Sequence, residues 1–349
     1  MTNNDSPSHN PPLRRVFYGR NAQIYYNVFM KHIILAGPTA SGKTELALAL
    51  AKQLKGEIIS ADSRQVYTHL TAGTAKPLGK WQQNRYMVDS IAYHMVDFLP
   101  PTETFDVFSF CQKSRALLVQ QPNKPFIFAG GTGMYVHALF IGIDKLPPAQ
   151  PALRLEMETF AQQNGREALH ARLKELDPIS AQQIPVQNIH RVIRALEITS
   201  VTGKPASQLK TGTFFQKQFP ADQVLFVYLN WDKELLNQRI AQRTQTMLDS
   251  MAEETRCLLA QKVHADCPGL KSLGYPEILQ WIDGIATREE TLEKIITRTR
   301  QYAKRQRTWF NRYEKILRLD IRHPQDFKTE KLVKQILATY CSADDSSLL

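Results

Sequence analysis

Short apolar runs alternate with longer amphipathic stretches along much of this chain. Four runs, at 33–36, 57–61, 126–129 and 224–229, are rich in aliphatic and aromatic residues and have the length of buried strands. Stretches with apolar residues three and four positions apart lie between them, as in amphipathic helices. Strands that alternate with helices form a parallel sheet with helices on both faces. The pattern therefore predicts an α/β fold built on such a sheet.

The pattern changes after a proline-rich stretch at 146–151. From there to about residue 210 the periodicity is helical throughout, and the strand pattern returns only afterwards. We therefore predict a helical insertion domain over 145–215. It would interrupt an α/β core formed by 30–144 and 216–320.

The two ends of the chain carry weaker patterns. Residues 1–29 show no apolar region followed by a cleavage site, which argues against a secretory signal and favours a disordered extension before Met30. Their arginines and scarcity of acids could also mimic an organelle transit peptide. Residues 321–349 end in serines and aspartates and are expected to form a loose tail.

A long, basic helix is predicted from Thr291 to about Leu319. At 100° per residue Tyr302, Trp309 and Tyr313 form one stripe, which we interpret as core packing. The opposite face gathers Arg300, Lys304, Arg307, Lys315 and Arg318. This basic face is either a solvated surface or a contact to a phosphate backbone, and the positive charge of the chain favours the second interpretation.

Charge is the unusual feature of the composition. The 349 residues include 44 Lys and Arg against 33 Asp and Glu, a net charge of +11. Such an excess indicates a polyanionic partner, nucleic acid before membrane, although a generally basic surface would give the same number. No apolar run approaches the roughly 20 residues that cross a bilayer, so no membrane partner is expected. The four cysteines lie far apart without a C-x-x-C pair, which predicts reduced thiols in a cytosolic protein.

One motif stands out after the first predicted strand. Eight residues form a complete G-x-x-x-x-G-K-[ST] pattern: Gly37, Pro38, Thr39, Ala40, Ser41, Gly42, Lys43 and Thr44. Such a phosphate loop wraps backbone N–H groups around a diphosphate at the N-terminus of the next helix. Lys43 would bring a positive charge to the phosphates and Thr44 a hydroxyl to Mg²⁺. A chance match in a turn is the alternative, but the strand and helix patterns on either side disfavour it.

Polar groups also follow the second and third predicted strands. They are the segment 62–65, which begins with Asp62, and the glycine-rich segment 130–133. Ligands of parallel α/β sheets collect at the carboxyl ends of strands, so these groups should meet the phosphate loop. Most phosphate-loop NTPases carry a metal-binding acid after a strand such as 126–129, and none is present here. The position of Asp62 instead disfavours motor proteins and GTPases and leaves a small-molecule kinase possible.

The sequence resembles the tRNA dimethylallyltransferase family, also called tRNA isopentenyltransferases, of bacterial type. The resemblance covers about 31–315 in seven ordered blocks: 37–44, 60–67, 73–77, 130–135, 191–197, 273–275 and 299–306. It implies transfer of a dimethylallyl group from dimethylallyl diphosphate to N6 of the adenine at tRNA position 37, with Mg²⁺ as the metal. It also implies a phosphate-loop NTPase-like fold and a cytoplasmic enzyme, which we expect to be a monomer.

The chemistry of this transfer fits the candidate residues. Negative charge grows on the departing diphosphate, and the loop amides, Lys43, Thr44 with Mg²⁺ and an arginine, Arg239 or Arg243, would stabilise it. The adenine amine is a weak nucleophile, so a carboxylate that accepts its proton would help, and Asp62 is our choice. A helix N-cap or a place in the outer shell of the Mg²⁺ ion are the alternatives for Asp62.

The resemblance also implies a set of residues that bind tRNA. Carried over by position, they are Asp62, Ser63, Arg64, Gln65, Thr132, Arg154, His190, Arg191, Val192, Ile193, Arg194, Leu270, Lys271, Ser272, Leu273, Gly274, Tyr275, Thr299, Arg300, Gln301, Tyr302, Ala303, Lys304, Arg305 and Gln306. Gln65 is the predicted base reader, because a side-chain amide can pair with an adenine edge. Structural roles are the alternatives: a turn hydroxyl for Thr132, a surface charge for Arg154 and core packing for Tyr275.

Three other functions compete with this one. An isopentenyltransferase that acts on free adenine nucleotide would need neither the insertion nor the basic helix. A nucleotide or metabolite kinase would consume ATP. An RNA-binding protein that uses the loop only as an anion anchor would bind tRNA and leave its mass unchanged.

Overall fold

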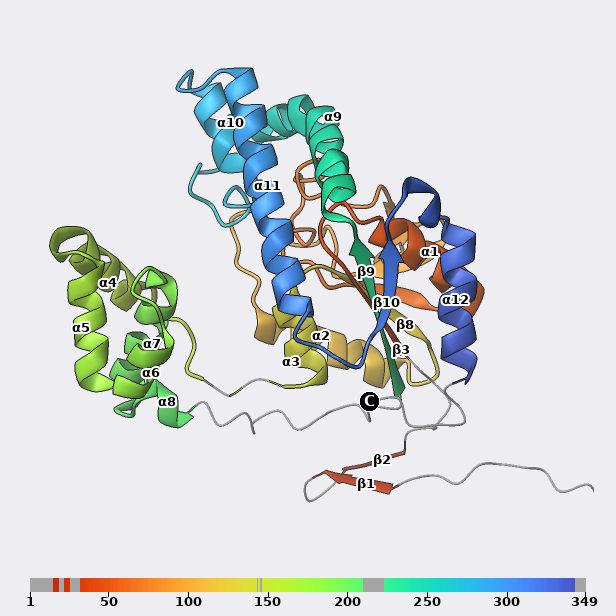
Figure 1. Cartoon of the computed structure of the whole chain (residues 1–349), viewed down its shortest axis with the longest axis horizontal. Coiled ribbons are helices and arrows are strands. Elements are labelled where there is room, and N and C mark those ends of the chain that lie inside the picture. The colour runs from red at the N-terminus through yellow and green to blue at the C-terminus, as the bar shows by residue number, and fades with distance from the viewer. Residues whose placement is uncertain are drawn as a thin grey trace, which may run out of the picture. The chain divides into compact units, whose positions relative to one another are not determined.

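A computed structural model of the chain describes residues 15–18, 22–25, 32–142, 144, 146–209 and 223–342. The chain divides into two compact units (Figure 1). Unit 1 consists of Met1–Val136 and Phe219–Leu349, and unit 2 is His137–Gln218. The predicted domain boundaries at 145 and 215 lie a few residues inside those of unit 2 and stay a prediction.

Unit 1 contains an eight-stranded sheet. In spatial order its strands are β10 (Leu317–Ile321), β9 (Val224–Trp231), β3 (His32–Ala36), β8 (Phe126–Gly130), β4 (Glu57–Ser60), β7 (Ile91–His94), β6 (Arg85–Val88) and β5 (Lys80–Gln82). Neighbouring strands are parallel from β10 to β7, and β6 and β5 continue the sheet antiparallel. The four strands predicted from the apolar runs are β3, β4, β8 and β9, and the predicted α/β fold is confirmed.

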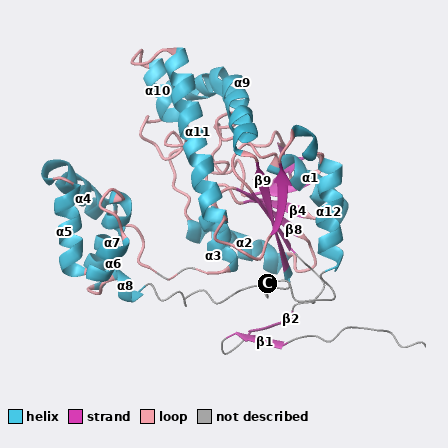
Figure 2. Cartoon of the chain, in the orientation of Figure 1, coloured by secondary structure: helices cyan, strands magenta, loops and turns pink. Residues whose placement is uncertain are grey.

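Helices cover both faces of this sheet (Figure 2). Successive side chains of β9 point to opposite faces of the sheet, as in any pleated strand, and so contact the helices on either side. Val227 and Leu229 join the core cluster that includes α1 (Lys43–Leu54) and α12 (Thr329–Ser342). Phe226 and Tyr228 lie against Phe310, the last residue of α11 (Arg288–Phe310). Residues of both faces are therefore buried, which explains the continuous apolar runs in the sequence.

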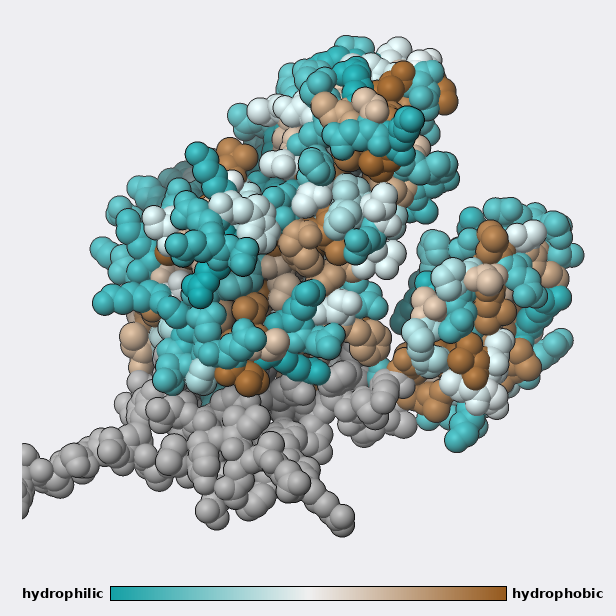
Figure 3. All heavy atoms as spheres, turned by 180° about the vertical axis from the view of Figure 1, so that it is seen from behind, coloured by the Kyte–Doolittle hydropathy of each residue, from teal (hydrophilic) through white to brown (hydrophobic). Residues whose placement is uncertain are grey.

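Three helices form a second core beside the sheet: α9 (Lys233–Ala260), α10 (Tyr275–Ile282) and α11. Leu248, Met251 and Ile295 are buried within it. Asp232 caps α9 by accepting hydrogen bonds from two backbone N–H groups, and Thr287 begins α11 with a capping box. The remaining helices of this unit are α2 (Val107–Gln120) and α3 (Gly133–Phe140), which runs on into unit 2. Hydrophilic residues cover most of the visible outer surface around α9, α10 and α11 (Figure 3).

Unit 2 is built from helices alone among its described residues. They are α4 (Pro151–Asn164), α5 (Arg166–Leu176), α6 (Pro178–Gln183), α7 (Ile189–Thr202) and α8 (Ala206–Leu209). Their core gathers apolar residues such as Leu169, Leu173, Ile193 and Leu196. The helical character predicted for this part of the chain is confirmed up to residue 209.

Two expectations about the C-terminal part are wrong. Helix α11 ends at Phe310 instead of continuing to Leu319, because 317–321 pair with β9 as the strand β10, in which Leu319 and Ile321 are buried and Asp320 is exposed. Lys315 and Arg318 are therefore not on the basic face of the helix. The expected loose tail contains the 3₁₀ helix η2 (Pro324–Asp326) and α12, whose buried side chains Leu332, Val333 and Ile336 pack into the core.

Five further strands were not predicted from the pattern. The strands β5, β6 and β7 are short, and turns with positive φ at Gln83, Asn84, Asp89 and Ser90 connect them. Within the expected disordered extension, β1 (Arg15–Tyr18) and β2 (Ala22–Tyr25) form an antiparallel pair rich in strand-forming residues. The rest of 1–29 lies outside the described residues. In the part of the chain that the structure describes, no helix has both the length and the apolar character needed to cross a membrane.

Candidate active site

A cavity of about 530 Å³ lies at the carboxyl ends of β3, β4 and β8. The end of β8 contributes Gly130, and the segments that follow the three strands contribute the phosphate loop, Asp62, Gln65 and Gly131. Helices α9 and α11 complete the wall with Arg239, Arg243, Tyr302 and Gln306. The structure thus brings together the loop, the acid and both candidate arginines, which come from separate parts of the sequence.

The phosphate loop ends in a backbone conformation that needs glycine. Gly42 has φ 85°, in the left-handed region, directly before α1 begins at Lys43. Gly42, the N-cap residue, has no side chain that could cap the first turn of α1. The N–H groups of that turn and the positive end of the helix dipole can therefore serve an anion in the cavity.

Lys43 is held inside the loop. Its Nζ donates hydrogen bonds to the carbonyl oxygens of Gly37 (3.1 Å) and Pro38 (2.7 Å) and contacts Ser41 Oγ at 3.3 Å. Burial lowers the pKa of the Lys43 ammonium to about 8, although the charge of Asp62 opposes the shift, and the nearby Arg243 lowers it further. A bound anionic ligand would favour the charged form of Lys43 and offset the unfavourable free energy of burying that charge.

This position of Lys43 predicts a pH dependence of anion binding. Only the ammonium form attracts a diphosphate ester, so the affinity of the free protein should be constant well below pH 8. Above that pH it should fall by up to about tenfold per pH unit as the amine loses its proton. Calorimetric titration between pH 6.5 and 9.5 would measure the effect. In Lys43→Arg the guanidinium stays charged, so the fall should disappear; the same fall in both proteins would contradict the assignment.

The two arginines of α9 lie one turn apart but differ in their contacts. Arg243 Nη2 donates to Thr39 Oγ1 (2.6 Å), and its buried Nε has no hydrogen-bond partner among the described residues. Burial lowers the pKa of Arg243 to about 10. Arg239 instead donates from Nε to the carbonyl of Ala40 (2.9 Å), and its guanidinium carbon lies 4.6 Å from the centre of the Trp231 ring. Arg243 thus keeps an unused donor, whereas Arg239 supports the loop.

An aromatic pair stands behind the same loop. Trp231 Nε1 donates to the carbonyl of Ser41 (3.0 Å), and its ring centre lies 5.4 Å from that of Phe327, which follows η2. A Cβ atom on Gly42 would lie only 2.3 Å from Phe327 Cζ, so the ring touches the loop itself. No local pattern predicts this contact, because residue 327 belongs to the segment expected to be loose.

Asp62 lies in the turn that follows β4. One carboxylate oxygen accepts a hydrogen bond from Arg64 N (2.8 Å), and Ser63 N donates to Thr132 Oγ1 (3.1 Å). No helix begins at Asp62, so its alternative role as a helix N-cap does not apply. Thr132 has the contact expected of a turn hydroxyl, the structural alternative named for it.

Gln65 is buried, with 8% of its surface exposed. Its Oε1 accepts from Ser60 Oγ (2.9 Å), and its Nε2 donates to the carbonyl of Ala75 (3.0 Å). Both ends of the amide are thus used inside the protein. Reading a base, the predicted role of Gln65, would require these hydrogen bonds to be exchanged.

The predicted tRNA segment of α11 has two faces. Thr299, Ala303 and Gln306 are buried, whereas Arg300, Gln301, Lys304 and Arg305 are exposed. Arg307, also assigned to the basic face, donates through Nη2 to the carbonyl of Trp231. Only part of the predicted basic face is therefore available to a partner.

Gln306 links α11 to two loops of the cavity. Its Oε1 accepts from Thr39 N (2.8 Å) and its Nε2 donates to the carbonyl of Gly131 (3.0 Å). A Cβ atom on Gly131 would lie 2.0 Å from Gln306 Nε2, so a side chain at this position would displace the Gln306 amide. One turn earlier, burial raises the pKa of the Tyr302 phenol, which hydrogen bonds to Thr132. These links between the helix and the loops were not predicted.

A second cavity of about 270 Å³ adjoins the first. It is lined by several residues predicted to bind tRNA: Asp62, Ser63, Arg64, Ser272, Leu273, Thr299, Tyr302 and Arg305. Leu270 and Gly274 are buried in the same part of unit 1, and Lys271 is exposed. The structure therefore gathers three of the predicted tRNA segments around one hollow.

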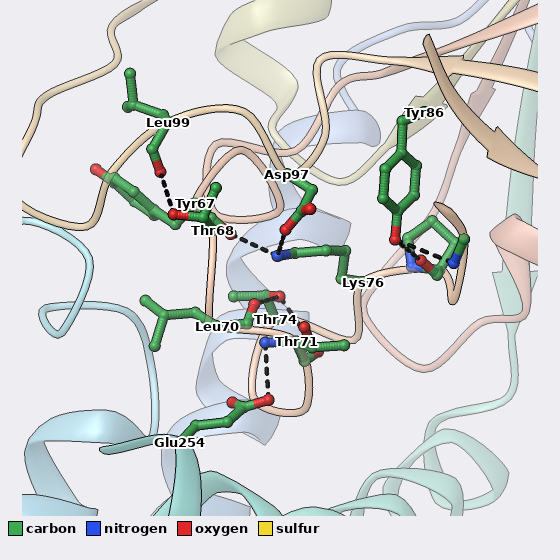
Figure 4. A network of polar contacts seen from close by, with 12 residues as sticks. Tyr67, Thr68, Leu70, Thr71, Thr74, Lys76, Tyr86, Asp97, Leu99 and Glu254 are labelled. Atoms are coloured by element: carbon green, nitrogen blue, oxygen red, sulfur yellow. Dashed lines mark hydrogen bonds and ion pairs between the residues drawn. The ribbon is translucent and has the colours of Figure 1, made fainter. Parts of the chain in front are cut away.

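A polar network fixes the segment 71–76 beside both cavities (Figure 4). Lys76 is buried and its Nζ donates to Asp97 Oδ1 and to the carbonyl of Tyr67, both at 2.5 Å. Glu254 of α9 accepts from the backbone N–H groups of residue 71 (2.9 Å) and residue 72 (2.7 Å) and from the Tyr275 hydroxyl (2.7 Å). Tyr275 is fully buried, which favours core packing, its structural alternative. Glu254 was not predicted as a site residue, because its loop partners lie about 180 positions away in the sequence.

Unit 2 holds the remaining predicted tRNA residues. Arg154 donates from Nε (2.8 Å) and Nη2 (2.9 Å) to the buried carboxylate of Glu197, and Arg194 donates to the same group (2.5 Å). Burial alone would raise the pKa of Glu197, but hydrogen bonds from these arginines and from Gln150 N lower it to about 2. Val192 and Ile193 are buried, and His190 and Arg191 are exposed. Arg154 is thus part of an ion-pair cluster rather than an isolated surface charge.

Known proteins match most of this chain. Residues 65–313 match the IPP transferase family and residues 30–89 the isopentenyl transferase family. A tRNA dimethylallyltransferase of Elusimicrobium minutum (strain Pei191) is 49% identical over 290 residues, which are 82% of this chain and 94% of that protein. Another, from Myxococcus xanthus (strain DK1622), is 41% identical over 80% of this chain and 89% of its own length.

Solved structures of related transferases are also similar to this chain. The full-length tRNA isopentenylpyrophosphate transferase of Bacillus halodurans has a TM-score of 0.62 and 31% identity, with 90% of this chain and 98% of that chain covered. A eukaryotic dimethylallyltransferase shares the fold with a TM-score of 0.70 at 24% identity, over 91% of this chain and 81% of its own.

Proposed function

The chain belongs to the tRNA dimethylallyltransferase family, and from this premise we propose that the cavity at the phosphate loop is where it acts. The protein is a prenyltransferase that modifies tRNA. Its reaction transfers a dimethylallyl group from dimethylallyl diphosphate to N6 of the adenine at tRNA position 37. The observation that carries the proposal is the meeting of Lys43, Asp62 and Arg243 in one cavity at the carboxyl ends of the central strands.

Diphosphate is the ligand we assign to the phosphate loop. The uncapped first turn of α1, the buried Lys43 ammonium and the unused Nε of Arg243 all offer donors to an anion. In the reaction the C1–O bond of the allylic diphosphate breaks and its electron pair leaves with the diphosphate. Preorganised donors that stabilise this growing charge lower the barrier. We assign this contact to Arg243 and the support of the loop to Arg239.

Asp62 is the proton acceptor in this proposal. The adenine N6 forms a bond to C1 while the C1–O bond breaks, and the proton of N6 moves to the Asp62 carboxylate. Asp62 suits the task because it lines both the phosphate-loop cavity and its neighbour. We assign the second cavity to the adenine, which must leave its stack in the anticodon loop to reach Asp62.

Mg²⁺ is the expected cofactor, and the residues present fit it. Thr44 and Asp62 line the phosphate-loop cavity. Among the described residues no group of three or more His, Cys, Asp or Glu side chains could hold a metal by itself. Thr44 would hold the ion together with the bound diphosphate, because Mg²⁺ is usually held by one or two protein oxygens and by phosphates of the substrate. When bound, Mg²⁺ would neutralise charge on the diphosphate.

The decisive experiment offers the protein unmodified tRNA, Mg²⁺ and dimethylallyl diphosphate and determines the mass of the nucleosides. We expect one dimethylallyl group on adenine at position 37. In one parallel reaction free adenine nucleotide replaces tRNA as the acceptor. In another, ATP replaces dimethylallyl diphosphate as the donor. Modified free nucleotide, or phosphorylation that depends on ATP, would favour the corresponding rival enzyme. Binding of tRNA without any change in its mass would indicate an RNA-binding protein without this activity.

We expect the enzyme to be a monomer and to act in the cytoplasm.

The exposed part of α11 should serve tRNA affinity. In Arg300→Gln/Lys304→Gln, binding should weaken for every tRNA, because contacts to the phosphate backbone carry no sequence information. The log–log slope of affinity against salt should flatten by about 0.7–0.9 for each phosphate that the variant no longer neutralises. Filter binding at several salt concentrations measures both quantities. The double variant Lys331→Gln/Lys334→Gln on the exposed face of α12 is the control. An unchanged slope in the α11 variant would mean that its basic face is only solvated.

A further inference from the structure

The two cavities meet at a small set of shared residues. Thr39, Asp62, Thr74, Arg243, Met247 and Tyr302 line both of them. With the diphosphate in one cavity and the adenine in the other, the reacting carbon must lie at this junction. Five of the six side chains are polar or carry a polar tip. Met247 is the one aliphatic side chain that lines both cavities among the described residues, so it is the apolar surface offered to the allyl group there.

The register of α9 places this methionine relative to the diphosphate. Arg243 and Met247 are four residues apart, so their side chains are neighbours on one face, about 5–6 Å apart at Cβ. If Arg243 holds the diphosphate, Met247 lies one helical turn further along, beside the carbon chain of the donor. Met247 is half-buried and packs against the core cluster of Leu248, Met251 and Tyr275. A packed core behind a side chain limits how far it can yield to a larger ligand.

We propose that Met247 is a specificity-determining residue that ends the isoprenoid site and restricts the donor to five carbons; this inference rests on the proposed function. The space beyond Met247 supports it. Met251 and Ile295 belong to the apolar core cluster against which Met247 packs, so they would wall the space that the trimmed side chain vacates. Trimming Met247 should therefore open room for a second isoprene unit without touching the groups that bind diphosphate or accept the proton.

A comparison of two donors tests the proposal. Wild type and Met247→Ala react with unmodified tRNA and either dimethylallyl or geranyl diphosphate, the ten-carbon allylic diphosphate, and nucleoside masses give kcat/KM for each donor. The ratio of geranyl to dimethylallyl transfer should rise by about tenfold or more in the variant, as expected when an apolar pocket gains space for extra carbons. The affinity for tRNA should stay unchanged. Met87→Ala trims another half-buried methionine, in β6, and should keep the wild-type ratio.

Further variants keep the proposal testable if Met247→Ala does not fold. Met247→Val removes less volume and should shift the ratio in the same direction, and Met247→Phe should reduce dimethylallyl transfer while tRNA still binds. Efficient geranyl transfer by the wild type, or an unchanged ratio in a folded variant, would overturn the role of Met247 alone. A wild type that leaves tRNA unmodified with dimethylallyl diphosphate would overturn the proposed function and this inference together.

Discussion

Turnover of dimethylallyl transfer should fall by about 10²–10⁴-fold in Asp62→Asn, the range found when a general base is removed. Asparagine keeps the shape of the side chain and can still accept a hydrogen bond from Arg64 N, so the turn after β4 should survive. It cannot take the proton of the adenine amine. Single-turnover kinetics with saturating tRNA and donor would measure the loss, and separate titrations should show both substrates still binding.

The form of the loss distinguishes the roles of Asp62. If higher Mg²⁺ or donor concentrations restore activity, Asp62 belongs to the surroundings of the metal. Activity near that of the wild type would remove it from the mechanism. Asp89→Asn is a matched control, because Asp89 is exposed in the hairpin between β6 and β7, and its positive φ of 47° suits asparagine equally well.

Arg243→Gln should reduce kcat/KM for dimethylallyl diphosphate by about 10²–10³-fold, the effect of removing one preorganised donor to a developing oxyanion. The buried guanidinium contacts Thr39 of the loop and keeps Nε free for the diphosphate. Glutamine removes the charge, the guanidinium donors and the contact with Thr39 Oγ1. Steady-state kinetics at saturating tRNA give the value, and the dissociation constant of tRNA serves as the check on folding.

Two other arginines of α9 complete this comparison. Arg239→Gln should have a smaller effect, because Arg239 acts on the loop through the carbonyl of Ala40. Arg256→Gln changes an exposed arginine of the same helix and should leave kcat/KM unchanged. A larger loss in Arg239→Gln than in Arg243→Gln would reverse the assignment of the diphosphate contact.

Local patterns account for what the sequence could predict. The strands β3, β4, β8 and β9 are apolar because both faces of the sheet are covered, and the phosphate loop is a contiguous motif. The topology of a parallel sheet then requires the segments after these strands to meet. Asp62 could therefore be placed near the loop from the sequence alone.

The features that could not be predicted from the sequence depend on contacts between distant segments of the chain. Gln306 meets Thr39 across 267 positions, and Glu254 meets Thr71 across 183. The helical periodicity of α11 does not distinguish Gln306 from the other polar residues of this basic helix. Gln306 is buried because α11 packs against the glycine-rich loop, where its Nε2 donates to the carbonyl of Gly131. The same limit applies to Met247, whose neighbours at the junction come mostly from other segments of the chain.

Phe327 lies against Gly42, β10 pairs with β9, and α12 packs on α1, so the phosphate-loop region is completed by residues near the end of the chain. During synthesis these residues leave the ribosome after the phosphate loop and the central strands. Until they do, the apolar side of α1 that receives Leu332, Val333 and Ile336 stays uncovered, a state in which nascent chains depend on chaperones. A chain cut short by a late stop codon would carry the whole loop motif and still lack the packing behind it.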